Sequence, residues 1–152
     1  NKVNSIINEV IKDGMSDLEK EKAIHDYLVL NCRYDYDNFL KGTIPEESYS
    51  AYGLLINGAG VCQAYAEATQ ILLSRAGIEC MIVTGSANGV GGWGGHAWNI
   101  VKIDGKYYHL DVTWDDPVPD EKGRVLYWYF NLTDEQISND HTWERSLYPE
   151  CK

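Results

Sequence analysis

The sequence has no excess of positive charge. Its 152 residues include 13 Lys and Arg against 23 Asp and Glu, which gives a formal net charge of -10. A phosphate backbone repels so acidic a chain, and we therefore expect no nucleic-acid partner. Hydrophobic residues make up 44% of the chain, which is too many for a disordered protein and suits one domain with a real core.

The sequence also lacks closely spaced cysteines. Cys32, Cys62, Cys80 and Cys151 are far apart and form no C-x-x-C pair. Four cysteines in a chain of this length do not make a disulfide scaffold. We expect Cys80, inside an apolar strand, to be a core residue. Cys32 and Cys151 are either core residues as well or a pair, and the redox compartment stays open.

No segment is apolar enough, without interruption, to span a membrane. Residues 48–66 carry no charge, but several glycines and the break at NGAG divide them. We interpret this segment as a buried loop followed by the start of a helix. Because the chain begins with Asn1 rather than Met, we expect it to be processed or cut from a longer chain, without its targeting segment.

Hydrophobic periodicity, capping boxes and turn residues predict the main elements. Helices are expected over 3–12 and 16–31, from about 62 to 77, and briefly from 133. Strands are expected over 78–85, 96–103 and 106–113, with a loop over 33–47 and a mobile glycine-rich loop over 86–95. Helices that lead into antiparallel strands indicate the α+β class. We expect a single domain over 1–152, with a mainly helical N-terminal part (1–47) and a catalytic core (48–152).

The stretch GAGVCQAYAEATQILLSRAG, residues 58–77, places a cysteine where a helical pattern begins. The first turn of a helix is the positive end of its dipole, and a thiolate is favoured there. Cysteines in helices are nevertheless more often core residues than catalytic ones. Cys62 is therefore a candidate nucleophile only if the sequence also supplies a base.

A β-hairpin supplies that base. Asp104-Gly105 is a strong signal for a two-residue turn, and with that turn Trp98 faces Asp111 on the next strand. His96 then lies on the same face as Asp111, as a diagonal neighbour with Cβ atoms roughly 7–8 Å apart. Their side chains can close that gap with a hydrogen bond. The opposite face is apolar enough to be core and carries Ala97, Val101, Ile103, Tyr108, Leu110 and Val112.

Cys62, His96 and Asp111 together match the needs of a thiol nucleophile. A thiol needs a base that takes its proton, and the base needs a third group that fixes its tautomer and stabilises its charged form. The backbone N–H groups at the helix start could form part of an oxyanion hole. This requires that the first turn of the helix packs against the hairpin.

Three motifs in this order, GAGVCQAYAEA, GHAWNIV and YHLDVTWDDP, resemble those of the transglutaminase-like superfamily. They are most similar to its bacterial, often secreted or surface-linked members. YDYDN at 34–38 and SAYGLLINGAG are similar as well, so the resemblance covers about residues 20–145. It implies a papain-like α+β core, in which a helix that begins at a cysteine packs on an antiparallel sheet.

The resemblance also implies a chemistry. Cys62 would be the nucleophile, His96 the general base and acid, and Asp111 the residue that orients the histidine. The reaction would be acyl transfer through a thioester from a peptide bond or a glutamine side chain, with hydrolysis favoured over cross-linking because no acceptor site is marked. It implies no cofactor, no calcium site and a peptide or protein substrate. It also suggests an extracellular or cell-surface location.

Five further residues are candidates for substrate binding, although core packing is the favoured interpretation for Trp98 and Trp114. They are Tyr52, Gln63, Trp93, Trp98 and Trp114. Trp93 belongs to the glycine-rich segment, which we interpret either as a flap over the substrate or as a plain surface loop.

Several alternatives stay open at this stage. His109 shares the face of Asp111 and is a second candidate base, whereas His25 and His141 are expected to be structural or exposed. A binding module that does not catalyse a reaction is the main alternative to an enzyme. A zinc site made of Cys62, His96 and Asp111 ranks last, because close-spaced ligand pairs are missing. Asp115 and Asp116 are expected to shape the turn before Pro117 rather than bind a metal.

Overall fold

The computed structural model describes residues 2–89, 92–117 and 121–152. Its helices are α1 (Lys2–Val10), α2 (Asp17–Asn31), α3 (Tyr36–Lys41), α4 (Ala51–Asn57), α5 (Cys62–Arg75) and α6 (Asp134–Ile137), with short 3-10 helices η1 (Glu46–Tyr49) and η2 (Arg145–Leu147). Its strands are β1 (Arg33–Tyr34), β2 (Ala59–Gly60), β3 (Cys80–Gly89), β4 (Gly92–Ile103), β5 (Lys106–Leu110), β6 (Phe130–Leu132) and β7 (His141–Trp143).

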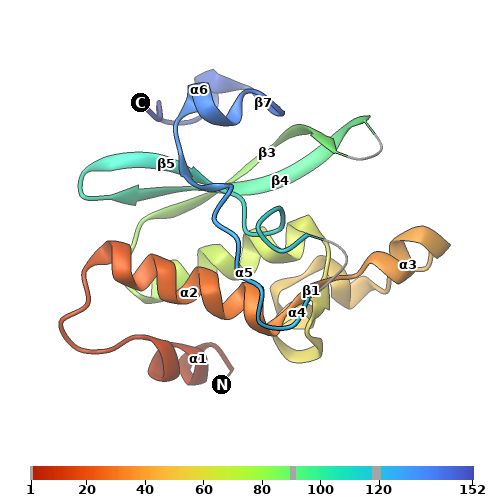
Figure 1. The fold of residues 1–152 in the computed structure, drawn as a ribbon, viewed down its shortest axis with the longest axis horizontal. Helices are drawn as coiled ribbons and strands as arrows, with labels where there is room; N and C mark the ends of the chain where they lie inside the picture. The colour runs from red at the N-terminus through yellow and green to blue at the C-terminus, as the bar shows by residue number, and fades with distance from the viewer. Residues whose placement is uncertain (1, 90–91, 118–120) are drawn as a thin grey trace.

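An antiparallel sheet with the order β6-β5-β4-β3-β7 separates two apolar cores. The larger core lies between the sheet and helices α2, α4 and α5, and it includes Leu28, Leu72 and Val101. The smaller core lies between the other face and the C-terminal segment, and it includes Trp98, Ile100 and Ile137. Figure 1 shows α5 on one side of the sheet and α6 on the other. The α+β class is confirmed.

The strongest local signals formed the predicted structures. Ser16 caps α2, because its side chain accepts from the N–H of Glu19 and the Glu19 side chain accepts from the N–H of Ser16. Thr133 and Gln136 form the same box at the start of α6. The β4–β5 turn has positive φ at both central positions, 51° at Asp104 and 83° at Gly105, as the type I′ turn requires.

Two predicted loops are wrong because tertiary pairing orders them. In the segment 33–47, β1 pairs with β2, α3 forms, and η1 begins, although no hydrophobic periodicity marks these short elements. In the glycine-rich segment, β3 continues to Gly89 and β4 already begins at Gly92, because each supplies the other with backbone hydrogen bonds. Val90 and Gly91 lie outside the described residues.

The uncharged segment 48–66 contains a helix of its own. It was predicted as a buried loop and a helix start, but α4 forms within it, capped by the side chain of Ser50. Within the described part of the chain, no helix has the length and apolar character needed to cross a bilayer. All four cysteines are free, so Cys32 and Cys151 do not pair, and Cys80 is a buried residue as predicted.

A carboxyl group is buried in α2 without full hydrogen bonding. Glu21 is 0% exposed, Asn131 donates to its Oε1 over 2.8 Å, and its Oε2 has no hydrogen-bond partner. Burial raises the pKa of Glu21 from 4.5 to about 7, against the effects of Asn131 and His25. At a pH above 4.5, Glu21 is ionised in the unfolded state, whereas in the folded state it keeps its proton until the pH reaches about 7. This carboxyl therefore removes stability as the pH rises from about 4.5 to about 7.

We expect Glu21→Gln to remove this loss. The difference between variant and wild type in the free energy of unfolding should rise from pH 5 to pH 8 by up to about 3 kcal/mol. Urea unfolding at both pH values measures it. Glu19→Gln on the same helix is the matched control, because glutamine also serves in a capping box. A difference for Glu21→Gln that does not change with pH would contradict the expectation.

Candidate active site

The half-buried Cys62 is the first residue of α5, and a set of backbone contacts fixes it there. The N–H of Asp35 donates to Gly60 O over 2.8 Å, and the N–H of Val61 donates to Ser48 O over 2.9 Å. The Ser48 hydroxyl in turn donates to the buried Asp35 carboxylate over 2.6 Å. Residues 60–61, directly before Cys62, are therefore held by hydrogen bonds to Asp35 and to Ser48.

The start of α5 differs from that of the other capped helices. Serine or threonine side chains cap α2, α4 and α6, whereas the N-cap residue of α5 is Val61, which makes no side-chain cap hydrogen bond. The capping residue thus leaves the first-turn N–H groups beside Cys62 available to another acceptor. A developing oxyanion is such an acceptor.

His96 and Asp111 form the hydrogen bond that the hairpin register predicted. Pairing from Ile103–Lys106 to Asn99–Leu110 gives the expected register, and His96 Nε2 lies 2.7 Å from Asp111 Oδ2. The N–H of Trp114 donates to the other carboxylate oxygen over 3.1 Å. The aspartate is therefore held at both oxygens.

The charges of the site stabilise one another. Burial opposes a charge on His96, but Asp111 and then Cys62 outweigh it and raise the pKa of His96 to about 10. Burial would raise the pKa of Asp111, but the neighbouring histidines lower it to about 2. Cys62 lies close enough to His96 to contribute to this rise in pKa.

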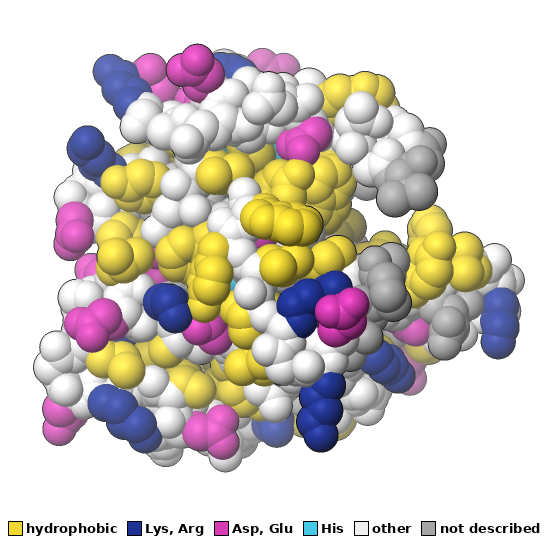
Figure 2. Space-filling view, viewed as in Figure 1, with side chains coloured by type: hydrophobic (Ala, Val, Ile, Leu, Met, Phe, Trp, Pro, Cys, Tyr) yellow, Lys and Arg dark blue, Asp and Glu magenta, His cyan; other side chains and the backbone are white. Residues whose placement is uncertain are grey.

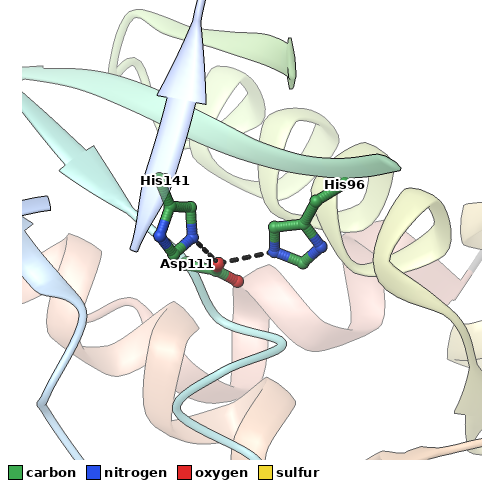
Figure 3. Close-up of side chains that lie close together, drawn as sticks. All are labelled: His96, Asp111 and His141. Carbon is green, nitrogen blue, oxygen red and sulfur yellow. Dashed lines mark hydrogen bonds and ion pairs between the residues drawn. The ribbon is translucent and has the colours of Figure 1, made fainter. Parts of the chain in front are cut away.

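A second histidine, His141, shares the same carboxylate. Its Nε2 lies 2.8 Å from Asp111 Oδ2, on the side away from His96 (Figure 3). His141 was predicted to be structural or exposed, and it is fully buried. It comes from β7, which pairs with β3 far from it in sequence. Neither periodicity nor a motif places β7 there, so sequence reasoning missed this contact.

The prediction of His109 as a second candidate base is wrong. The Trp98 indole N–H donates to His109 Nδ1 over 3.0 Å, so this nitrogen carries the lone pair. In the neutral ring the proton is then on Nε2, which faces Asp134 over 2.7 Å. The ring is 0% exposed, and burial lowers its pKa. Both nitrogens are engaged, and neither can reach a substrate.

Among the described residues, two clusters have the residue types of metal ligands, and both are hydrogen-bonded networks in this conformation. They are His96, Asp111 and His141, and His109, Asp134 and Cys151. Two ligand atoms on a tetrahedral zinc ion lie about 3.3 Å apart. The N···O separations of 2.7 and 2.8 Å at Asp111 are shorter and fit a shared proton. In the second cluster, the Trp98 bond keeps a proton on the nitrogen that a metal would need. Neither cluster contains Cys62, which belonged to the zinc alternative that ranked last in the sequence.

The predicted substrate-binding tryptophans fall into three different positions. Trp98 is 1% exposed and stacks beneath the His96 ring, so it packs the site rather than contacting a substrate, which corrects the prediction. Trp114 is half-buried, with its ring centroid 5.4 Å from that of His96. Trp93 lies in β4 opposite Asn88 and is 54% exposed. Trp114 thus borders the site directly.

Gln63 and Tyr52 are both exposed. Gln63 follows the cysteine, is exposed, and donates to Glu67 over 3.4 Å. Tyr52 is 69% exposed and lines an apolar depression with residues of α1 and α5. Ile71, from the far half of α5, lines that depression too. The predicted role of Tyr52 in substrate binding stays a prediction.

The two aspartates after the hairpin brace the turn that carries Asp111. Asp115 accepts from Tyr129 N over 2.8 Å and lies 2.9 Å from His25 Nε2. Asp116 accepts from the Tyr65 hydroxyl of α5 over 2.7 Å. Both carboxylates link the turn to neighbouring elements, in keeping with the structural role predicted for them.

Comparison with known proteins places this site in a family. A model of the transglutaminase-like superfamily matches residues 4–112, which is more than half of the chain. The chain belongs to the transglutaminase-like superfamily. The matched range contains Cys62, His96 and Asp111 and ends before His141.

Curated relatives of this chain are much longer proteins. Kyphoscoliosis peptidase from Mus musculus is 25% identical over 152 residues, which cover 91% of this chain and 23% of the relative. The same protein from Homo sapiens is 25% identical over 153 residues, with the same coverage of 91% and 23%. The chain thus spans less than a quarter of their length.

Solved structures from several enzyme classes share the fold of this chain. A candidate cysteine protease from Cytophaga hutchinsonii aligns with a TM-score of 0.57 and 26% identity, over 73% of this chain and 36% of that one. A structure described as a TGase aligns with a TM-score of 0.59 and 16% identity, over 81% and 32% of the two chains. The Bacillus cereus arylamine N-acetyltransferase, which has a Cys-His-Glu triad, aligns with a TM-score of 0.55 and 14% identity, over 74% and 48%.

Proposed function

We propose that the chain is a cysteine-dependent acyl-transfer enzyme that cleaves amide bonds. The observation that carries this proposal is the position of His96. Its ring interacts with Cys62 and also lies 2.7 Å from the Asp111 carboxylate. A thiol at an uncapped helix start, a histidine and an orienting carboxylate are the parts that nucleophilic catalysis by a thiol requires.

The reaction proceeds in two steps. The Cys62 thiolate attacks the amide carbonyl carbon, a C–S bond forms, and first-turn N–H groups of α5 stabilise the oxyanion. His96 gives its proton to the amide nitrogen, the C–N bond breaks, and the amine leaves a thioester behind. In the second step His96 takes a proton from the attacking water, the new C–O bond forms and the C–S bond breaks. A carboxylic acid leaves, and the Cys62 thiolate is restored beside the protonated His96.

Hydrolysis is the proposed outcome, with an amine as the competing acceptor. Cys62 is half-buried rather than enclosed, and water is the most abundant acceptor at such a site. The relatives named as peptidase and candidate cysteine protease fit this preference. The TGase and the acetyltransferase share only the fold.

The surface beside Cys62 supports a peptide substrate with apolar side chains. The Tyr34 hydroxyl lies near Cys62, and burial together with Cys62 raises its pKa to about 12. Its ring contacts Phe39, which stacks on Tyr36 in the exposed helix α3. Phe39 is 54% exposed and Leu40 63% exposed. Figure 2 shows hydrophobic side chains gathered over α3.

The pH dependence of Cys62 alkylation tests the proposal. Iodoacetamide labelling followed by mass spectrometry compares Cys62 with the buried Cys32, Cys80 and Cys151 in one sample. An ordinary thiol loses its proton near pH ~8.5. We expect fast labelling of Cys62 well below that pH, and a clear loss of this labelling in His96→Ala. Labelling that follows an ordinary thiol would contradict the proposal and favour a binding module.

Product analysis decides between the acceptors. A library of peptides with internal amide bonds and glutamine side chains is incubated with the protein, with and without a primary amine. We expect products with a new carboxylate to dominate. If amine adducts dominate at a millimolar amine concentration, the proposed reaction is transamidation rather than hydrolysis.

A further inference from the structure

The hydrogen-bond network of the site continues beyond Asp111 to the protein surface. The Tyr129 hydroxyl donates to Asp140 Oδ2 over 2.5 Å, and Asp140 Oδ1 lies 2.7 Å from His141 Nδ1. His141 Nε2 lies 2.8 Å from Asp111 Oδ2, which also accepts from His96 over 2.7 Å. Five residues thus form one continuous chain that ends at the catalytic histidine.

The partners of His141 define its charge. Each ring nitrogen faces a carboxylate oxygen, and ionised carboxylates only accept hydrogen bonds. With both carboxylates ionised, both contacts are hydrogen bonds only when each nitrogen carries a proton, which makes the ring an imidazolium. Charges then alternate along the chain: Asp140 is negative, His141 positive and Asp111 negative. A fully buried cation between two anions is stable, whereas an unpaired one is not.

The fold holds His141 in place independently of the catalytic residues. Strand β7 pairs with β3, with His141 opposite Ala87. This pairing needs Gly85, because a Cβ there would lie 2.1 Å from Thr142 O. The rings of Trp98 and Trp114 lie 4.8 and 4.7 Å from the His141 ring and shield it from water.

We propose that His141, held as a cation by Asp140, is a positioning residue that shares the Asp111 carboxylate with His96 and so sets the pH range in which Cys62 and His96 work. This inference rests on the proposed function. A carboxylate shared between two cations holds each less strongly than it would hold one. His141 also fixes the carboxylate in the orientation that His96 needs.

The groups around His141 determine the sign of the effect. Its titratable and charged neighbours are Asp111, Asp140, His96, His109 and Tyr129. Arg145 also lies close enough to affect His109. Without the His141 cation, the Asp111 carboxylate interacts with His96 alone. The pKa of His96 should then rise, so that His96 keeps its proton to higher pH. The same positive charge also stabilises the Cys62 thiolate from a distance. Without it, the thiol should lose its proton at higher pH.

His141→Gln tests this inference, because a glutamine amide can still donate to Asp111 but carries no charge. The acid and the alkaline limbs of the kcat/KM profile should both move to higher pH by about one unit. The pH profile of Cys62 alkylation should move in the same direction, which gives a readout that does not need a substrate. Unchanged limbs with a lower rate would mean a purely structural role and would overturn the inference.

His25→Gln is the matched control. His25 is also buried between two carboxylates, 2.9 Å from Asp26 and 2.9 Å from Asp115, but it does not touch Asp111 or His96. We expect it to lower stability without moving either limb. An equal shift in both variants would assign the effect to general loss of buried charge and overturn the inference.

The wild-type protein offers a second test that does not depend on the folding of a variant. Nitrogen-15 NMR of the imidazole rings reports whether each nitrogen carries a proton. We expect two protonated nitrogens on His141 at neutral pH, and a neutral His141 ring would overturn the inference. If wild-type Cys62 labels like an ordinary thiol, the proposed function fails, whatever the NMR shows for His141.

Discussion

Cys62→Ala should abolish turnover of a peptide substrate, with a loss of roughly 10^4-fold or more. The whole proposed reaction passes through a bond to this sulfur, and alanine offers no nucleophile. The side chain is half-buried at the start of α5, so its removal leaves no large core cavity. We therefore expect the variant to fold with nearly the stability of the wild type, and the loss reports chemistry rather than unfolding.

Two measurements check this result. Steady-state turnover gives the size of the loss, and mass spectrometry after a rapid acid quench detects the acyl group on Cys62 in the wild type only. Cys80→Ala is the matched control, because Cys80 is a buried free thiol in β3 away from the site. Retention of full activity in Cys62→Ala, or an acyl group on another residue, would refute the assignment of the nucleophile.

Asp111→Asn should lower both activity and stability by large amounts. Asp111 is 0% exposed and accepts from His96, His141 and the N–H of Trp114. An asparagine turns an N–H group toward one of these donors and leaves two buried cations without their anion. Breaking a buried ion pair costs about 3–5 kcal/mol. Loss of the orienting carboxylate lowers kcat by roughly 10^4-fold in a related catalytic arrangement.

The stability loss should depend on pH in one direction. The pKa of Asp111 is lowered from 3.8 to about 2 in the folded protein, so its contribution is complete above pH 3.8 and disappears as the pH falls through 2. Urea unfolding at pH 7 and near pH 2 should therefore show a large difference between variant and wild type that shrinks in acid. Asp116→Asn is the control, because Asp116 accepts from the neutral hydroxyl of Tyr65 and asparagine can still accept from it. Equal losses at both pH values would contradict a role for the Asp111 charge.

Local sequence patterns determined much of the site because they act over few residues. Asp104 and Gly105 permit positive φ, and this turn fixed the register that places His96 beside Asp111. Cys62 follows Val61 at the point where helical periodicity begins, and α5 starts there. These outcomes need only neighbours in sequence or across one tight turn.

The elements that sequence reasoning missed have no such local signal. β1 and β2 are two residues long and exist because Arg33 and Tyr34 meet Ala59 and Gly60. The glycine-rich ends of β3 and β4 contain few residues with strand propensity, and their pairing with each other overrides it. The sequence allowed Trp98 to be a cleft residue, but it packs in the smaller core and is buried there.

The sequence by itself therefore determined the family, the α+β class and the residue types of a thiol site. Only the tertiary structure decided which further groups join that site. His109 and His141 look alike in sequence, yet the Trp98 hydrogen bond confines one to a neutral ring, while two carboxylates surround the other. The physical reason is that the charge of a buried histidine depends on its partners, and long-range packing chooses those partners.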